Sequence, residues 1–238
     1  CNVLPFRIDF INTVKKKDDT KDKKVHAIDK EAALLSPERI REVTNYILEH
    51  FDQKTYIHQN CSLFTHRVIT NVEEVAGNRH NKAKEEKGLR KVNGFNSIFA
   101  VASIEMAMKY YAEFKKQLEE RNKKLTIATI FSFSVNEEDP DDVLPDEGFE
   151  TDKLDKTSRD FLDMAISDYN RNFSVNYDTS EDKFHNYYKD LSMRVKNREV
   201  DLLIVVNMFL TGFDATTLNT LWVDKNLKHH GLIQAFSR

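Results

Sequence analysis

The sequence predicts an α/β fold, with a parallel sheet that has helices on both faces. Short runs that are apolar at every position, such as Leu202–Val206, are typical of strands buried inside a parallel sheet. Between these runs lie longer segments with apolar residues three and four positions apart, which is the spacing of amphipathic helices. Strands that alternate with helices favour a parallel sheet over an antiparallel one.

Residues 1–92 are predicted to form a mixed segment that precedes this sheet. Near its start, LPFRIDFI alternates apolar and polar residues as a strand does, and the lysine- and aspartate-rich run Lys15–Lys24 is expected to be a solvated loop. A helix is predicted near 37–51, because Ser36 can cap it and the proline that follows suits its first turn. The polar residues 78–92 are expected to be partly disordered or to form a hairpin loop.

The predicted sheet lies in residues 93–238. Its strands are expected at Ile98–Ala102, Leu125–Phe133, Leu202–Val206 and Leu218–Val223. The acidic stretch Asn136–Lys156 cannot bury enough apolar surface to fold by itself, so we expect a solvated insertion there. Within it, Asn136–Asp146 is expected to be among the most mobile parts of the chain, together with the lysine-rich run near the start.

Composition limits the possible functions. The chain has 238 residues, enough for one large or two small domains with a sizeable core. Its formal net charge is -3, so any contact with DNA must come from a local basic patch. The cysteines, Cys1 and Cys61, suggest neither a disulfide framework nor a zinc site, and fit a reducing cytoplasm. The sequence has no run of about 18 apolar residues, so no membrane span is expected.

The most informative stretch is Asp201–Arg238, DLLIVVNMFLTGFDATTLNTLWVDKNLKHHGLIQAFSR. It is predicted to form a buried strand, a polar turn, a second strand and the start of a helix that carries Gln234 and Arg238. Ligands of open α/β sheets bind at the carboxyl ends of strands, so the polar residues here are candidates for a site. By residue type alone, Thr211–Asp214 could equally be an ordinary tight turn.

This stretch resembles a known family. LLIVVNMFLTGFDA is similar to motif V of superfamily 2 helicases, in the form found in the motor (R) subunit of type I restriction enzymes. LNTLWVDKNLKHHGLIQAFSR is similar to the segment after motif V in that subunit, ending in motif VI, and GFNSIFAVASIEMAMKYY resembles the motif IV region. The resemblance implies a RecA-like (P-loop NTPase-type) sheet, with the second RecA-like helicase domain in 93–238 and a connection from the first domain in 1–92. Since the chain begins with Cys and stops within motif VI, we expect a fragment of a longer polypeptide.

The resemblance also implies roles for single residues. Thr211 would offer its hydroxyl to a DNA phosphate, Gly212 would let the backbone approach the nucleotide, and Asp214 would lie near the ATP ribose. Gln234 and Arg238, the first arginine of motif VI, would belong to the catalytic part of the ATP cleft. The second arginine of that motif, which is usually assigned as the arginine finger, is absent from the chain.

Three further residues are expected to contact DNA. Ser103 could be an ordinary N-cap, or it could hold a DNA phosphate together with the free amides of the helix it begins. Lys225 and Lys228 form a small basic cluster with His229 and His230 beside motif VI. Such a cluster could equally be surface decoration or a contact between domains.

Several expected motifs are absent from the sequence. It contains no G-x-x-x-x-G-K-[ST] loop, no DEAD-like acidic box, and no nuclease carboxylate-lysine motif, and we assign no metal ligands. ATP and Mg²⁺, which the resemblance implies, would therefore be held mainly by the missing first RecA-like domain. We expect the isolated fragment to have neither ATPase nor nuclease activity.

The function that the resemblance implies is that of the second motor domain of an ATP-dependent translocase of double-stranded DNA, in a type I restriction endonuclease of a bacterial or archaeal cytoplasm. Its partners would be double-stranded DNA, the first RecA-like and nuclease domains of the same subunit, and the modification and specificity subunits. Two alternatives remain open: a domain of another superfamily 2 DNA helicase, and a non-catalytic α/β binding module.

Overall fold

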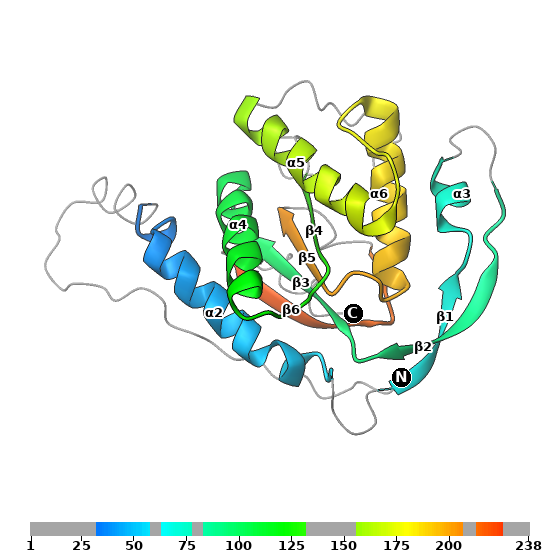
Figure 1. The fold of residues 1–238 in the computed structure, drawn as a ribbon, viewed down its shortest axis with the longest axis horizontal. Helices are drawn as coiled ribbons and strands as arrows, with labels where there is room; N and C mark the ends of the chain where they lie inside the picture. The colour runs from blue at the N-terminus through cyan, green and yellow to red at the C-terminus, as the bar shows by residue number, and fades with distance from the viewer. Residues whose placement is uncertain (1–31, 58–62, 78–82, 132–155, 207–212, 226–238) are drawn as a thin grey trace, which may run out of the picture.

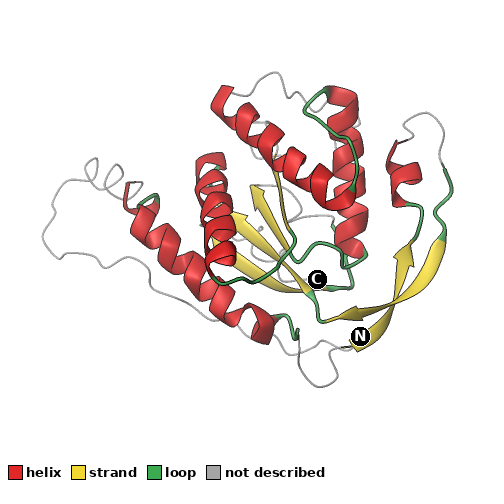
Figure 2. Cartoon of the chain, in the orientation of Figure 1, coloured by secondary structure: helices red, strands yellow, loops and turns green. Residues whose placement is uncertain are grey.

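The structure is a computed structural model that describes residues 32–57, 63–77, 83–131, 156–206 and 213–225. Helices and strands alternate along much of the chain (Figure 1; Figure 2). The helices are α2 (Pro37–Lys54), α3 (Val72–Gly77), α4 (Ile104–Glu120), α5 (Lys156–Phe173) and α6 (Glu181–Lys196). The strands are β1 (Leu63–Ile69), β2 (Lys87–Asn93), β3 (Asn96–Val101), β4 (Ile127–Phe131), β5 (Leu202–Val206) and β6 (Leu218–Asp224).

The main sheet has four parallel strands in the order β4-β5-β3-β6. Every residue of β3, β4 and β5 is buried, which is why these strands are apolar at nearly every position. The predicted α/β fold with a parallel sheet flanked by helices is confirmed. The prediction that Leu202–Val206 is a central, buried strand is also confirmed, since β5 pairs with a strand on each side.

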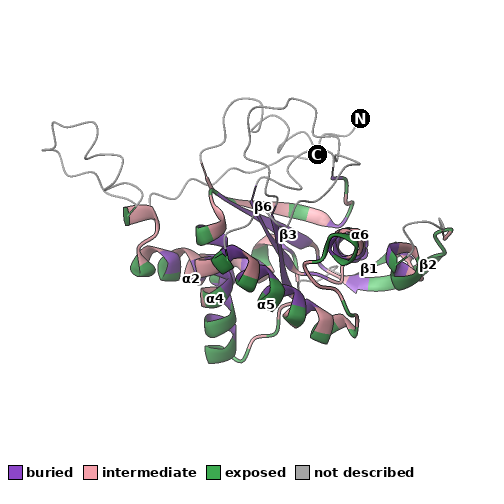
Figure 3. Ribbon diagram, turned by 90° about the horizontal axis from the view of Figure 1, so that it is seen from above, coloured by how far each residue is buried: buried purple, intermediate pink, exposed green. Residues whose placement is uncertain are grey.

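One face of the sheet packs against α2, α4 and α5, which lie together on one side of it (Figure 3). The register places Phe99 of β3 beside Ile204 of β5, so the two side chains share a face. Phe99 makes an edge contact with Tyr110 of α4, with ring centroids 4.8 Å apart. On the same face, Phe131 of β4 stacks on Phe161 of α5 at 6.0 Å. Aromatic side chains therefore fill the layer between the sheet and these helices.

The helix predicted near 37–51 is α2, and it continues to Lys54. Ser36 caps it as expected, because its side-chain oxygen accepts a hydrogen bond from the amide of Arg39 at 3.3 Å. The buried side of α2 consists of Ile40, Thr44, Ile47, Leu48 and Phe51. This side packs against α4, so α2 is part of the same core as the parallel sheet.

A second, two-stranded sheet joins β1 and β2 in an antiparallel ribbon, with Leu63 opposite Asn93 and Ile69 opposite Lys87. The expectation that residues 78–92 are partly disordered or a hairpin loop is wrong for Lys87 onward, where the chain is strand. The sequence hides this strand because KGLRKVN has few apolar residues to mark a buried face. This segment becomes a strand because its backbone pairs with β1, although its side chains show no apolar alternation.

The inner face of this ribbon is anchored to the end of α6. Asn197 pairs its side-chain amide with the backbone of Ile69, accepting from the amide nitrogen and donating to the carbonyl oxygen, both at 2.8 Å. The His66 ring nitrogen Nε2 lies 2.8 Å from the carbonyl oxygen of Lys196. In addition, α3 packs along α6 (Figure 1). These contacts fix which face of the ribbon points outward.

A buried ionic cluster joins α5, α6 and α3. Asp190, which is fully buried, accepts a hydrogen bond from the hydroxyl of Tyr169 and one from Nε of Arg194 at 2.7 Å. Arg194 also contacts Glu199 at 2.8 Å and Glu73 of α3 at 3.2 Å. Burial raises the pKa of Tyr169 well above its usual value, and the Asp190 carboxylate raises it further. The tyrosine therefore stays protonated and donates to the aspartate.

The strand boundaries differ slightly from the predictions. The first parallel strand starts at Asn96 rather than Ile98, and the second starts at Ile127 rather than Leu125. The later start has a cause, since the amide of Thr126 donates to the side chain of Asp201 at 2.7 Å instead of to a neighbouring strand. The segments expected to be most mobile, in the lysine-rich run and the acidic insertion, lie outside the described residues.

Gly94 should be required at the turn between β2 and β3. Its φ is +61°, and a Cβ there would lie 2.7 Å from the carbonyl oxygen of Thr55 and 2.9 Å from the amide nitrogen of Ile57. Gly94→Ala should therefore lower the free energy of unfolding by roughly 1–3 kcal/mol, measured by urea denaturation. Gly77→Ala is the matched control, because a Cβ at Gly77 meets nothing within 4 Å. Equal stability of the two variants would contradict the prediction.

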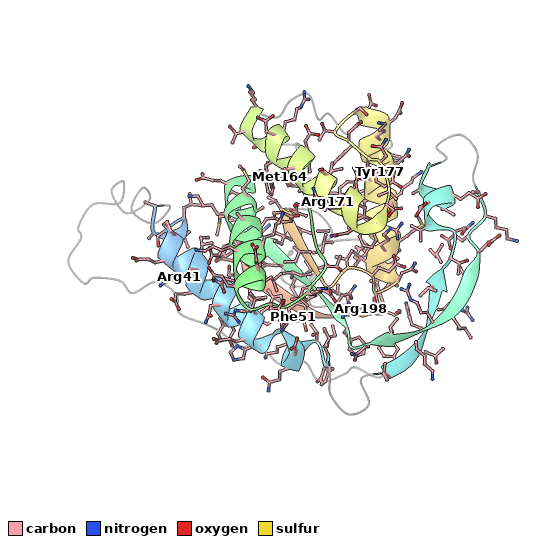
Figure 4. The ribbon with its side chains drawn as sticks, in the orientation of Figure 1. Arg41, Phe51, Met164, Arg171, Tyr177 and Arg198 are labelled. Atoms are coloured by element: carbon pink, nitrogen blue, oxygen red, sulfur yellow. The ribbon has the colours of Figure 1, made fainter. Side chains whose placement is uncertain are left out.

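Arg194→Met should destabilise the fold by roughly 3–5 kcal/mol, because it leaves the carboxylate of Asp190 buried without its cation. Adding Asp190→Asn should recover part of this loss, since a neutral amide oxygen still accepts from Tyr169. The control is Arg171→Met on α5 (Figure 4), where the arginine side chain is 76% exposed and its ion pair is long at 3.5 Å. That variant should stay within about 1 kcal/mol of the parent protein in the same denaturation experiment.

Candidate nucleotide and DNA site

Two of the predicted DNA contacts meet at the carboxyl edge of the parallel sheet. Val101, the last residue of β3, pairs with Asp224, the last residue of β6. Ser103 follows β3 directly, and Lys225 follows β6 directly. Because neighbouring parallel strands end at the same edge, the fold brings these two residues, 122 positions apart in the sequence, to adjacent strand ends.

Ser103 is the N-cap of α4. Its backbone is extended and its side-chain oxygen accepts a hydrogen bond from the amide of Met106 at 3.2 Å. The ordinary capping role is therefore confirmed. The cap satisfies the amide of Met106, whereas the amides of Ile104 and Glu105 have no carbonyl partner inside the helix, and the positive end of the helix dipole lies at this edge. The acidic side chain of Glu105 in the same turn is paired with Lys109 at 3.0 Å, which reduces its repulsion of an anion.

Lys225 is half-buried at the same edge, and burial lowers the pKa of its ammonium group. A nearby anion would favour the charged form and offset this effect. It is the place of Lys225 at the carboxyl end of β6, next to the N-terminus of α4, that makes it a candidate for contact with a phosphate.

Asp224, next to Lys225, is held by Arg39 and Tyr110, which no sequence motif had marked as site residues. Arg39 of α2 makes two hydrogen bonds to its carboxylate, at 2.8 Å and 2.5 Å, and the hydroxyl of Tyr110 of α4 donates to it at 2.5 Å. Burial raises the pKa of Tyr110 well above its usual value, and the carboxylate adds to the effect. No sequence signal could pair these residues, because Arg39 and Asp224 lie 185 positions apart. The pair fixes the end of β6, and with it the backbone that carries Lys225.

Asp214 lies at the opposite edge of the sheet from Ser103 and Lys225. It precedes β6, and so stands near the amino end of that strand. A strand of seven residues spans roughly 23 Å, so the length of β6 separates Asp214 from Lys225. The polar candidates were predicted at the carboxyl ends of strands, whereas those among the described residues lie at both edges of the sheet.

The turn that carries Asp214 is anchored by its neighbours. Phe213 is buried, and the ammonium nitrogen of Lys196 lies 5.4 Å from the centre of its ring. Thr217 is fully buried, and its hydroxyl lies 3.3 Å from the carbonyl oxygen of Val195. Asp214 itself is exposed and makes no hydrogen bond or ion pair within the described part of the chain. Its carboxylate is therefore accessible while its backbone is held in place.

The remaining predicted site residues lie outside the described residues. They are Thr211, Gly212, Lys228, Gln234 and Arg238. Across the ranges that the structure describes, no cluster of three or more His, Cys, Asp or Glu side chains could hold a metal ion. Within the same ranges, no helix is both long and apolar enough to cross a membrane.

Comparison with known proteins identifies relatives over the whole chain. An endonuclease subunit of a type I restriction enzyme from Staphylococcus aureus (strain COL) is 38% identical over 100% of this chain, which covers 21% of the relative. The corresponding subunit from Staphylococcus saprophyticus is 37% identical with the same coverage. The HindI endonuclease subunit of Haemophilus influenzae is 40% identical over 26% of the chain and 6% of its own length. The chain thus spans about a fifth of the length of the staphylococcal relatives.

The match to a protein family covers the parallel sheet. Residues 93–238 match the family described as type I restriction enzyme subunit R domain 3. This range includes all four parallel strands, together with the segments whose residues resemble motifs IV, V and VI. The fold, the family match and the full-length similarity agree, and the chain belongs to the family of type I restriction enzyme R (endonuclease) subunits.

Proposed function

We propose that this chain is the second RecA-like motor domain, with its preceding connection, of an R subunit that couples ATP hydrolysis to translocation of double-stranded DNA. The observation that carries the proposal is the order of the motif-like segments on a parallel sheet in a chain of this family. The described sheet supports it by bringing Ser103 and Lys225 to one edge while Asp214 remains accessible at the other.

The carboxyl edge is the proposed DNA contact. The N-terminus of α4 offers free backbone amides and a positive dipole end, which together suit a phosphate. Lys225 adds a cation at the neighbouring strand end, and Lys228 would extend the contact from the segment that follows β6. Thr211, only three residues before Asp214, would meet a DNA phosphate on the side of the opposite edge. Contacts of this kind hold the DNA backbone without reading its sequence.

The turn at Asp214 is the proposed nucleotide contact. An exposed carboxylate that has no partner among the described residues can accept hydrogen bonds from ribose hydroxyls, so Asp214 fits a nucleotide. Gly212 would allow the backbone to approach, and Gln234 and Arg238 would face the phosphates, where an arginine supplies a charge that is fixed at all working pH values. ATP and Mg²⁺ would be held mainly by the first RecA-like domain, and this chain would form the other wall of the cleft.

Strand β6 gives this proposal a physical link between the two contacts. Asp214 precedes it and Lys225 follows it, and the Arg39–Asp224 pair fixes its carboxyl end. A rigid, paired strand can transmit a shift at the nucleotide turn to the DNA edge. The DNA, the nuclease domain of the subunit, and the modification and specificity subunits are the proposed partners.

Ser103→Asp should weaken DNA binding by the full-length subunit without lowering its stability. Aspartate is as good an N-cap as serine, so α4 should remain intact, while the new carboxylate repels a phosphate. The measurements are fluorescence anisotropy with a labelled duplex and a thermal melt. Ser103→Asn is the matched control, because it keeps a capping oxygen without adding charge, and it should bind DNA normally. If the Ser103→Asp and Ser103→Asn variants bind DNA with equal affinity, Ser103 does not contact DNA.

Arg238→Ala and Asp214→Ala should each abolish or greatly reduce DNA-stimulated ATP hydrolysis by the full-length subunit, since both would act at the ATP cleft. Loss of an arginine finger typically costs roughly 10³ to 10⁵ in rate, and Arg238, as the first motif VI arginine, should also cost orders of magnitude. Thr211→Ala should instead reduce the stimulation by DNA more than the basal rate. ATPase rates with and without DNA, alongside a thermal melt, test all three.

The controls for these variants are Arg171→Ala and Asp160→Ala, which remove exposed charges from α5. Both should retain normal turnover. An Arg238→Ala subunit with normal DNA-stimulated turnover would refute the motif VI assignment. An Arg238→Ala subunit that merely unfolds would show that the residue is structural.

A further inference from the structure

The outward face of the β1–β2 ribbon is strongly basic, although the chain as a whole has a net charge of -3. The register of the ribbon and the alternation of its side chains place eight residues on this face. They are Leu63, Thr65, Arg67, Ile69, Lys87, Leu89, Lys91 and Asn93. Ile69 packs against the cluster of Val72, Ala76 and Met193, and Asn93 is half-buried, whereas the other six are exposed. Three are cations and none is acidic, so this face carries about three positive charges in an acidic chain.

The three cations lie close together. Arg67 is directly opposite Leu89, so Lys87 and Lys91 are its two diagonal neighbours on the other strand. Diagonal neighbours in such a ribbon have Cβ atoms roughly 7–8 Å apart. All three side chains are exposed, and neither Arg67 nor Lys91 forms an ion pair within the described residues. Lys87 has only a long contact of 3.5 Å to Glu85.

The basic face points away from the core, because the opposite face of the ribbon already packs against the rest of the protein. Val68 and Val92 are buried there, and Phe64 stacks on Phe95 with ring centroids 5.1 Å apart. Arg90, on the same inner side, pairs with Glu199 at 2.9 Å. Like charges held as close as those on the outward face repel one another and do not stabilise the ribbon. A polyanion bound to the face would remove this cost.

A cavity of about 640 Å³ adjoins the ribbon and extends the positive charge. Each acid in its lining already has a cation: the pairs are Lys123–Asp52 at 2.8 Å, Arg90–Glu199 at 2.9 Å and Arg198–Asp201 at 2.6 Å. Lys91 and Lys124 also line it, are exposed, and form no ion pair in the described part of the chain. The lining therefore has a surplus of two positive charges. Arg198, which is labelled in Figure 4, lies just before the amino end of β5.

We propose that the outward face of the β1–β2 ribbon, with Arg67, Lys87 and Lys91 and continued by Lys124 at the cavity, binds the phosphodiester backbone of DNA. Charge complementarity favours this occupant, because duplex DNA carries one negative charge per roughly 1.7 Å of its axis and can engage several cations at once. This surface is separate from the carboxyl edge that carries Ser103 and Lys225. The identity of the polyanion rests on the proposed function.

The test neutralises the face in the full-length subunit with Arg67→Gln, Lys87→Gln and Lys91→Gln together. All three side chains are exposed, so the thermal melt should be unchanged. Affinity for a labelled duplex, measured by fluorescence anisotropy at several salt concentrations, should fall equally for unrelated sequences. The slope of log affinity against log salt should become shallower by about 0.9 for each phosphate that the variant no longer neutralises, and so by up to about 3.

The matched control is Arg41→Gln, Lys116→Gln and Lys156→Gln, which removes the same charge from exposed positions on α2, α4 and α5 (Figure 4 labels Arg41). It should leave the salt slope unchanged. If the control loses as much DNA affinity as the ribbon variant, the effect comes from net charge alone and the proposal is overturned. A normal slope in the ribbon variant would overturn it as well.

Two further measurements separate the competing occupants. If the ribbon variant loses affinity for inorganic phosphate or ATP but keeps its DNA affinity, a small phosphate ligand occupies the face and the proposal fails. The face also exposes Leu63 and Leu89, so assembly with the modification and specificity subunits is followed by size-exclusion chromatography. A ribbon variant that assembles poorly but binds DNA normally would identify a protein interface instead.

Failure of this inference and failure of the proposed function have different signatures. If the unmodified subunit binds no DNA, the proposed function fails and this inference fails with it. If that subunit binds DNA, and Ser103→Asp weakens binding while the ribbon variant does not, only the ribbon proposal is refuted.

Discussion

The position of β5 inside the sheet is the constraint on which the rest of the structure depends. Its five residues are apolar and buried, and it pairs with β4 on one side and β3 on the other. Since parallel strands need long crossovers, the helices must pack around the sheet and all four carboxyl ends must lie at one edge. The packing of Phe99 and Phe131 against α4 and α5 results from that arrangement, as does the meeting of Ser103 and Lys225 at adjacent strand ends.

Polar contacts then hold the irregular parts of the chain on this sheet. Asp190 and Arg194 join α6 to α5 and α3, Asn197 substitutes for a backbone partner of β1, and Arg39 ties α2 to the end of β6 through Asp224. Each contact is directional and largely shielded from water, so removing one partner leaves a buried group unsatisfied. Helix α2 and the β1–β2 ribbon are thus packed against the rest of the core, which would let a movement of α2 reach the edge proposed to contact DNA.

The proposed motor role and the proposed basic ribbon are related by charge. With a net charge of -3, the chain has no overall attraction for DNA, so the proposed role requires its cations to be concentrated where DNA would pass. The carboxyl edge supplies few cations of its own among the described residues. A ribbon that carries Arg67, Lys87 and Lys91 without acids would add electrostatic attraction without adding sequence specificity, which is what a translocating enzyme requires.

The sequence by itself determined the parallel α/β fold, the central strand Leu202–Val206, the helix that begins after Ser36 and the family, because apolar periodicity, capping residues and motif order are local properties of the chain. Only the tertiary structure decided the strand β2, since the polar KGLRKVN becomes a strand through pairing with β1. The same holds for the partners of Asp224, for the placement of Asp214 at the edge opposite Ser103, and for the gathering of Arg67, Lys87 and Lys91 on one face. The physical reason is that register and long-range ion pairs depend on which segments meet in space, and spacing along the sequence does not encode that.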